Sequence, residues 1–296
     1  MGRTRLRGLE IAGIQIGIEV PEPCEWDWPE TSLSEFACPP RDPEVHVGVR
    51  VAELAENDLR GERYALGAST FEIARRGEDW LVGLSRGGKR QQLALFDRDF
   101  RTGEVVQTPD WARQRKYPLS GGLDEWIVLQ RTVARGGLCV SGCATVQAGG
   151  AQVALGPEQA GGTHGWRVAT PSLLGRQTLV LREQGAGLRV FRTPWSGSMD
   201  ERLGSDARVV EMRCSDESVH AYRELLDPSD AAEELVSFAV LPLCDEGFLD
   251  RVLRNARQAS ERTKLFRVGS PAAREQTAAC PPPSLANVLM PLRGIV

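Results

Sequence analysis

Residues 156–163 read Gly-Pro-Glu-Gln-Ala-Gly-Gly-Thr, which is the spacing of a phosphate-binding loop with one exception. In such a loop backbone N–H groups cradle the phosphates, a lysine reaches the β- and γ-phosphates, and Ser or Thr holds magnesium. Here Gly162 occupies the lysine position, and Glu158 places a carboxylate where a polyanion would sit. The alternative is a plain strand-to-helix turn without a ligand. If the loop binds an anion, its candidate contacts are Gly156, Gly161, Thr163 and His164.

Patterned segments on both sides of this loop predict the elements that would hold it. Short apolar runs at 138–145 and 151–155 suit buried strands, and the second runs directly into Gly156. Apolar residues at helical spacing predict a helix over 123–133, ended by Gly136-Gly137. The last third reads as mostly helical, with a start at Asp227-Pro228 and an apolar face over 248–256. We therefore expect an α/β fold.

The first 115 residues read as β-rich. Apolar residues alternate with small or polar ones over 14–20 and 45–51, as in half-buried strands. Residues 80–82 and 93–96 predict a hairpin around Gly87-Gly88. The expected organisation is a β-rich N-terminal domain (1–115), a P-loop domain (116–280) and a tail (281–296).

Composition narrows the function classes. The 296 residues carry a net charge of −4, so no overall basic field points to nucleic acid or to an anionic membrane. No apolar run is long enough to span a membrane, and the N-terminus lacks a signal peptide's apolar stretch. The seven cysteines are odd in number and irregularly spaced, which favours reduced thiols and a cytoplasmic location. Cys139 and Cys143 lack a second ligand pair at zinc-site spacing.

Four segments, in order, resemble the bacterial HPr kinase/phosphorylase-like family, and more closely the serine-kinase-like proteins encoded beside peptide-modification genes. They are residues 117–119 (YPL) before the helix, 136–142 (GGLCVSG), the loop at 156–163, and 191–197 (FRTPWSG). The last resembles the family's Gly-Thr-Pro-Trp-x-Gly segment and is the most specific. The resemblance implies a PEP-carboxykinase/HPr-kinase-like P-loop domain with a β-rich N-terminal part and a helical C-terminal end.

The chain departs from this family where the chemistry lies. Cys139 stands in place of the family's histidine, Gly162 in place of the phosphate lysine, and Arg176-Gln177 in place of its acidic pair. Phosphoryl transfer depends on positioned positive charge and metal, so these losses predict that catalysis is gone. We expect no catalytic residues, no metal and no cofactor. The framework positions retained are Gly156, Gly161, Thr193, Pro194, Trp195 and Gly197.

The resulting expectation is a non-catalytic, pseudokinase-like protein that serves as a binding, scaffold or regulatory subunit for a protein or peptide partner. Two alternatives stay open. An atypical ATP- and magnesium-dependent serine or peptide kinase, a phosphotransferase, would need Arg176, Arg192 or His164 to supply the missing charge. An anion or nucleotide sensor without chemistry would bind independently of magnesium. Kinases of this family often assemble, so a homo-oligomer is a further alternative.

A loop rich in proline, tryptophan and acid, at 20–43, holds the candidate partner contacts Trp26 and Trp28. Exposed tryptophans on such a loop can anchor a partner. The alternative is that both rings fold back as a lid on the sheet.

Three other candidates have plainer explanations. Residues 83–90 match the glycine and lysine spacing of a phosphate loop, and 83–87 match Gly-x-Ser-x-Gly around Ser85. Both motifs require a helix next, whereas the hairpin prediction places a strand there. His46 lies in a strand pattern as a surface or packing residue, and His220 lies in a helical stretch.

Overall fold

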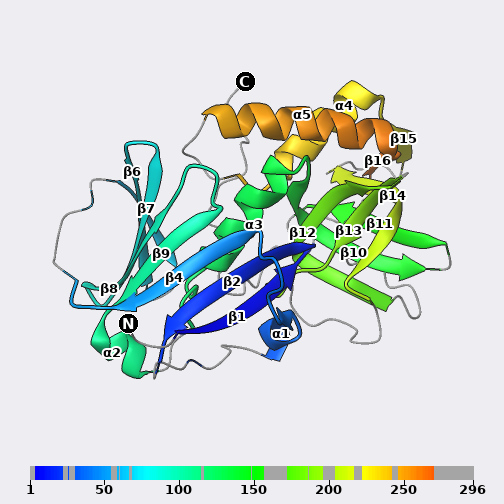
Figure 1. Cartoon of the computed structure of the whole chain (residues 1–296). Coiled ribbons are helices and arrows are strands. Elements are labelled where there is room, and N and C mark those ends of the chain that lie inside the picture. The colour runs from blue at the N-terminus through cyan, green and yellow to red at the C-terminus, as the bar shows by residue number, and fades with distance from the viewer. Residues whose placement is uncertain are drawn as a thin grey trace. The chain divides into compact units, whose positions relative to one another are not determined.

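The computed structural model (Figure 1) describes most of the chain in segments. These are residues 4–22, 26, 31–54, 59, 61–66, 69–114, 117–147, 149–156, 172–185, 187–195, 204–216, 222–241 and 246–269. They divide within helix α3 (Leu123–Ala134) into two compact units, one up to Arg131 and one from Thr132.

Strands dominate both units, so the predicted α/β class is wrong. Of the described residues, 52% lie in strands and 22% in helices. They form two large sheets, one of which contains a closed five-stranded barrel, and show no evident α/β P-loop domain. The prediction failed because short apolar runs do not reveal whether strands pair in parallel or antiparallel fashion.

The first unit is built on a nine-stranded sheet with the order β3-β1-β2-β4-β9-β8-β7-β6-β5. Two parallel pairs, β2–β4 and β4–β9, lie in its middle, and the other pairs are antiparallel. The strands are β1 (Thr4–Ile11), β2 (Ile14–Pro21), β3 (Ala37–Cys38), β4 (Val45–Val51), β5 (Glu62–Leu66), β6 (Ser69–Arg76), β7 (Asp79–Arg86), β8 (Lys89–Phe96) and β9 (Thr102–Gln107).

This sheet confirms the β-rich reading of the first 115 residues. The predicted strands at 14–20 and 45–51 are β2 and β4. The predicted hairpin is β7–β8, and its turn residues Gly87 and Gly88 have φ of 58° and 78°. Two successive positive φ values match the twist of a two-residue hairpin and favour glycine at both positions.

Aromatic rings fill the core of the first unit. The Phe100 ring lies 6.1 Å from that of Trp80 and 6.0 Å from that of Trp126, centroid to centroid. Trp126 comes from α3, which is buried on almost every side. Two shorter helices, α1 (Thr31–Ser34) and α2 (Pro109–Arg113), complete the unit.

The second unit contains a seven-stranded sheet whose first five strands close into a barrel. The order is β11-β10-β12-β13-β14-β16-β15, and a parallel pairing of β11 with β14 forms the seam. Val153 and Met212 lie opposite each other across the seam and are fully buried. The strands are β10 (Leu138–Gln147), β11 (Gly150–Leu155), β12 (Ser172–Gln184), β13 (Gly187–Phe191), β14 (Asp206–Asp216), β15 (Tyr222–Leu225) and β16 (Leu265–Gly269).

Two packed helices, α4 (Pro228–Ser237) and α5 (Glu246–Arg262), belong to this unit (Figure 1). The predicted start of α4 is confirmed, because the Asp227 side chain accepts from the N–H groups of Ser229 and Asp230 at 2.8 and 3.0 Å. The wider prediction of a mostly helical last third is wrong, since β14, β15 and β16 lie there. None of the described helices is long and apolar enough to cross a membrane.

Candidate binding surfaces

The predicted phosphate loop starts at Gly156, which is anchored to β10. Its N–H donates to the Ser141 carbonyl at 3.0 Å, and the Ser141 hydroxyl donates to the Gly156 carbonyl at 3.4 Å. Gly156 has a φ of 138°, a conformation that favours glycine. The other predicted anion contacts, Gly161, Thr163 and His164, lie outside the described residues, as do Gly162 and His220.

The surroundings of Gly156 correct the predicted P-loop domain. The motif needs a strand, the loop and a helix in an α/β setting. Strand β11, which leads into Gly156, instead lies in the barrel wall, antiparallel to β10. The next described element is β12, also antiparallel to β10. The predicted order of a strand followed by Gly156 is therefore present, but this strand belongs to a mainly antiparallel barrel.

The positions singled out by the family resemblance have structural contacts. Thr193 is fully buried, and its hydroxyl donates to the Thr178 carbonyl at 2.7 Å. Cys139 is buried in β10, and its carbonyl accepts from the Val240 N–H at 2.8 Å. Arg176-Gln177 lies within β12, opposite Cys143 and Gly142 in the register. These contacts give Thr193 and Cys139 structural roles in the second unit.

Trp26 is packed, with only 4% of its surface exposed. The Arg7 guanidinium lies 4.5 Å from the ring centroid and also donates to the Trp26 carbonyl at 3.1 Å. On another side the ring lies 6.4 Å from that of Tyr117. This placement matches the alternative in which the ring folds back onto the protein. Trp28 lies outside the described residues.

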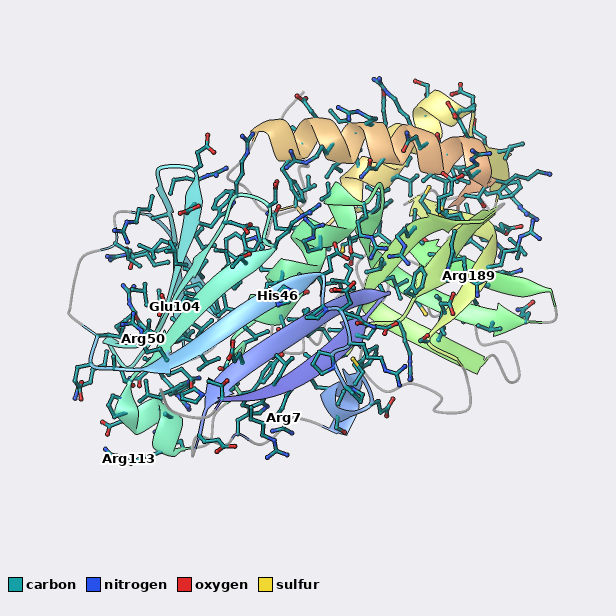
Figure 2. The ribbon with its side chains drawn as sticks, viewed as in Figure 1. Arg7, His46, Arg50, Glu104, Arg113 and Arg189 are labelled. Carbon is teal, nitrogen blue, oxygen red and sulfur yellow. The ribbon has the colours of Figure 1, made fainter. Side chains whose placement is uncertain are left out.

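On the first sheet, Ser85 and His46 have the simpler roles expected of them, in a hairpin and on the surface of a strand. Ser85 is followed by the turn and by strand β8, and its hydroxyl accepts from Arg90 Nε at 3.1 Å. His46 is exposed, and Figure 2 shows its place on β4. On the same strand Arg50 pairs with Glu104 at 2.7 Å. In the part of the chain that the structure describes, no three His, Cys, Asp or Glu side chains are grouped to hold a metal ion.

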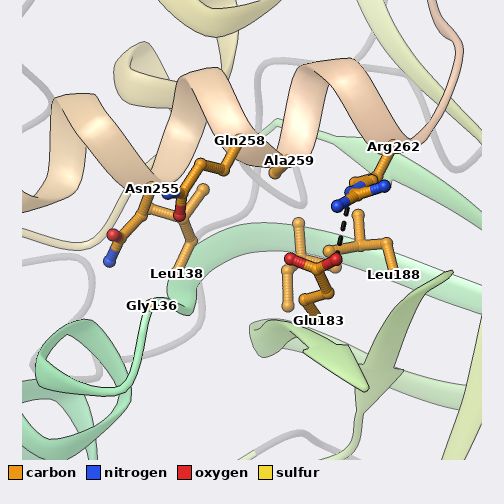
Figure 3. Close-up of a pocket in the computed structure, with 9 residues that line it drawn as sticks. Gly136, Leu138, Glu183, Leu188, Asn255, Gln258, Ala259 and Arg262 are labelled. Carbon is orange, nitrogen blue, oxygen red and sulfur yellow. Dashed lines mark ion pairs between the residues drawn. The ribbon is translucent and has the colours of Figure 1, made fainter. Parts of the chain in front are cut away.

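A small pocket lies between α5 and the barrel strands (Figure 3). Its free volume is about 10 Å³, roughly the room for one water molecule and too little for a nucleotide. One end is closed by the ion pair of Arg262 with Glu183 at 3.0 Å. At the other end Asn255 donates to two main-chain carbonyls. The pocket is therefore a packing feature of the helix on the barrel.

A more promising surface lies on one face of strands β14, β16 and β15. Leu225 has 55% of its surface exposed and lies opposite Phe266 in the β15–β16 register. The Arg223 guanidinium stacks 3.9 Å from the centroid of the Phe266 ring. An aromatic ring, an arginine and an exposed leucine are thus neighbours on one face.

Charged side chains lie beside Leu225 and Phe266. Glu211 accepts from Arg223 Nη2 at 2.6 Å and also pairs with Arg213. Two guanidinium groups therefore pair with the same carboxylate. We call Glu211, Arg213, Arg223, Leu225 and Phe266 the Arg223 face.

The opposite face of the same strands packs inward. Arg267 of β16 pairs with Glu234 of α4 at 2.7 Å and with Glu224 at 3.5 Å. The hydrogen bond that Arg267 donates to Glu234 is the main cause of a raised pKa for Arg267. Met212, Cys214 and Leu265 are buried. This side is therefore part of the protein interior, and the Arg223 face is the outward side.

Sequence reasoning missed the Arg223 face because it assigned this region to helices. Alternation gives a signal in β14, where polar Arg213 is followed by buried Cys214, but it misleads in β16, where Phe266 lies outward and Arg267 inward. Pairing Arg223 with Phe266 required the register between two separate strands, which the sequence does not give.

Two comparisons with known proteins found no relative of this chain. No protein-family model matches the chain, and no curated protein matches it.

Proposed function

We propose that this chain is a non-catalytic binding protein whose partner, a protein or a peptide, docks on the Arg223 face. The observation that carries the proposal is the exposed Leu225 beside Phe266, with the Arg223 guanidinium stacked on that ring. Arginine and aromatic residues dominate the binding energy of protein interfaces, especially beside apolar contacts that exclude water.

The ion pair with Glu211 supports the same proposal. It holds the Arg223 guanidinium in place over the ring before any partner arrives. Less side-chain freedom is then lost on binding, so more of the contact energy becomes affinity. The exposed guanidinium of Arg223 would attract an acidic partner.

A photo-crosslinking experiment tests this surface. Benzoylphenylalanine is introduced at position 225, and at position 113 as a control, because Arg113 is an exposed residue on α2 of the other unit. We expect a discrete crosslinked product from position 225 that is absent from position 113 and lost when Arg223→Glu is added. Identical products from both positions, or products unaffected by Arg223→Glu, would contradict the proposal.

A nucleotide experiment tests the non-catalytic part. Thermal shift is measured with ATP and with GTP, each with and without magnesium, at millimolar concentration. We expect no stabilisation. Stabilisation that depends on magnesium would favour the kinase alternative, and stabilisation that is independent of magnesium would favour the sensor.

The proposal also places the protein in the cytoplasm. Cys139 and Cys214 are buried thiols, the form that cysteine keeps in a reducing compartment. Fractionation of producing cells checks this, and recovery of the chain outside the cytoplasm would contradict it.

A further inference from the structure

We infer that the partner binds as an extended peptide strand added to the edge of β15, a mode that rests on the proposed function. In the sheet order β15 is the last strand, and among the described residues it pairs with β16 alone. Tyr222 is half-buried and the other three residues of β15 are exposed. An exposed strand edge of this kind is a template for main-chain hydrogen bonding.

The register shows which main-chain groups face the open edge. Leu226 N–H donates to the Leu265 carbonyl at 3.0 Å, and these residues continue the pairing of Leu225 with Phe266. Hydrogen-bonded and non-hydrogen-bonded pairs alternate along an antiparallel ladder. Glu224 therefore bonds toward β16, whereas the N–H and C=O groups of Arg223 and Leu225 point away from it. An added antiparallel strand could exchange about four hydrogen bonds with these two residues.

The side chains of β15 define the peptide that fits. A residue opposite Leu225 would lie on the Arg223 face and should be apolar. A residue opposite Arg223 should be acidic, because it would lie beside the exposed Arg223 guanidinium and opposite charges across a strand pair stabilise it. Glu224 is on the other face and favours a basic neighbour. Read from its N-terminus, an antiparallel partner would carry the order apolar, basic, acidic.

The charge pattern argues against one pairing with a second copy of this chain, the one centred on Glu224. Two copies of β15 aligned about Glu224 would place their glutamates directly opposite each other. Like charges in that position destabilise a strand pair. A partner with the apolar–basic–acidic order has no such conflict.

The test uses two synthetic nine-residue peptides with the full chain. The probe is acetyl-Ser-Thr-Thr-Val-Lys-Glu-Thr-Thr-Ser-amide, and in the control peptide the glutamate is replaced by lysine. Binding is followed by fluorescence anisotropy of labelled peptides, and hydrogen exchange of the Arg223 and Leu225 amides is measured with and without the probe. We expect saturable binding of the probe, at least about tenfold weaker binding of the control peptide, and slower exchange at both amides.

Three variants test whether binding occurs by strand addition. Leu225→Pro removes an outward N–H but no bond to β16, so it should abolish binding, whereas Leu225→Ala should only weaken it. Arg223→Glu should reverse the preference and bind the lysine control peptide instead of the probe. This charge reversal keeps the inference testable if Leu225→Pro does not fold. Light scattering on the chain alone gives its mass and so shows whether it is a monomer or a dimer.

Strand addition is overturned if the probe shows no saturable binding up to millimolar concentration, or if Leu225→Pro binds as well as Leu225→Ala. It is also overturned if the chain alone is a dimer that Leu225→Pro dissociates, because the edge then belongs to a second copy. If the peptide fails while the crosslink at position 225 persists and depends on Arg223, strand addition is wrong and the proposed function stands. Loss of both means that the Arg223 face is not the binding surface.

Discussion

Asn255 of helix α5 donates from one side-chain nitrogen to the carbonyls of both Val133 and Gly137, each at 2.9 Å. The Val133 carbonyl lies in the last turn of α3, where a helix has no intrahelical donors, and Gly137 follows the end of the helix. Gly136, with a φ of 79°, reverses the chain there and donates its N–H to the same Val133 carbonyl. Asn255 therefore caps one helix from another.

Replacing Asn255 should lower the stability of the fold. Asn255→Leu leaves both carbonyls without the side-chain donor in a buried site, so the free energy of unfolding should fall by about 2–4 kcal/mol. Gln258→Ala, on an exposed position of the same helix, should change it by less than about 0.5 kcal/mol. Urea denaturation of the three proteins measures both effects. Equal stabilities for the two variants would show that the cap contributes nothing.

The buried guanidinium of Arg131 should matter more than an exposed one. Its side chain is 5% exposed, donates to Glu44 at 2.5 Å and also to the Asp99 carbonyl at 2.8 Å. Arg131→Met removes the buried ion pair with Glu44 and should lower the free energy of unfolding by about 3 kcal/mol.

Arg50 provides the matched control for this prediction, because its ion pair with Glu104 is exposed, at 61% and 49% for the two side chains. Arg50→Met should change stability by less than about 1 kcal/mol. Denaturant titration compares the two. A similar loss from both variants would contradict the role of burial.

Tyr117 should make the fold sensitive to alkali. Burial, and secondly the charge of Asp124, raises its pKa well above the ordinary 10.0. Below that pH the phenol is protonated in both the folded and the unfolded chain, so the shift has no effect on stability. Above it the unfolded chain loses the proton and the folded chain keeps it, so the free energy of unfolding falls by about 1.4 kcal/mol per pH unit from this group.

Tyr117→Phe removes that contribution. The variant should therefore lose stability less steeply than the wild type as the pH rises above 10, and the two should run parallel below it. Thermal unfolding at a series of pH values gives both slopes. Identical slopes above pH 10 would mean that Tyr117 ionises as easily in the folded protein as in the unfolded one.

Cys38 should react slowly with alkylating reagents. Burial, and secondly the Glu10 carboxylate, raises its pKa, so less thiolate is present at neutral pH and alkylation is slowed. Glu10→Gln removes the second cause and should speed the reaction with iodoacetamide. Glu19→Gln, on the neighbouring strand β2, is the control and should leave the rate unchanged. Peptide mass spectrometry after timed alkylation reads out the rates.

Local chemistry in the sequence predicted individual elements well. Alternation located β2 and β4 within a residue or so, and the pair Gly136-Gly137 marked the end of α3. Asp227 marked the start of α4 because its side chain satisfies N–H groups only a few residues away. Such signals depend on neighbours in the chain, so they survive without knowledge of the fold.

The sequence alone could not predict which strands pair when they are far apart along the chain. The run at 151–155 is a strand, as expected, but nothing in it reveals that one neighbour is β14 and the other β10. The glycines after it suggested a phosphate loop, and that local resemblance led to the wrong class. The Arg223 face depends in the same way on the register of β15 with β16, which brings Arg223 over Phe266.

The barrel seam has a consequence for how the protein is made. Ala151 and Val209, which pair across the seam, are about sixty residues apart along the chain. A ribosome adds about 5–20 residues per second, so β11 waits roughly 3–12 s for β14 to be synthesised. During that interval its seam edge is an unpaired strand edge, which invites pairing with other nascent chains. Slower translation across residues 156–209 would lengthen this exposure, and a chaperone that shields strand edges would be needed most at that stage.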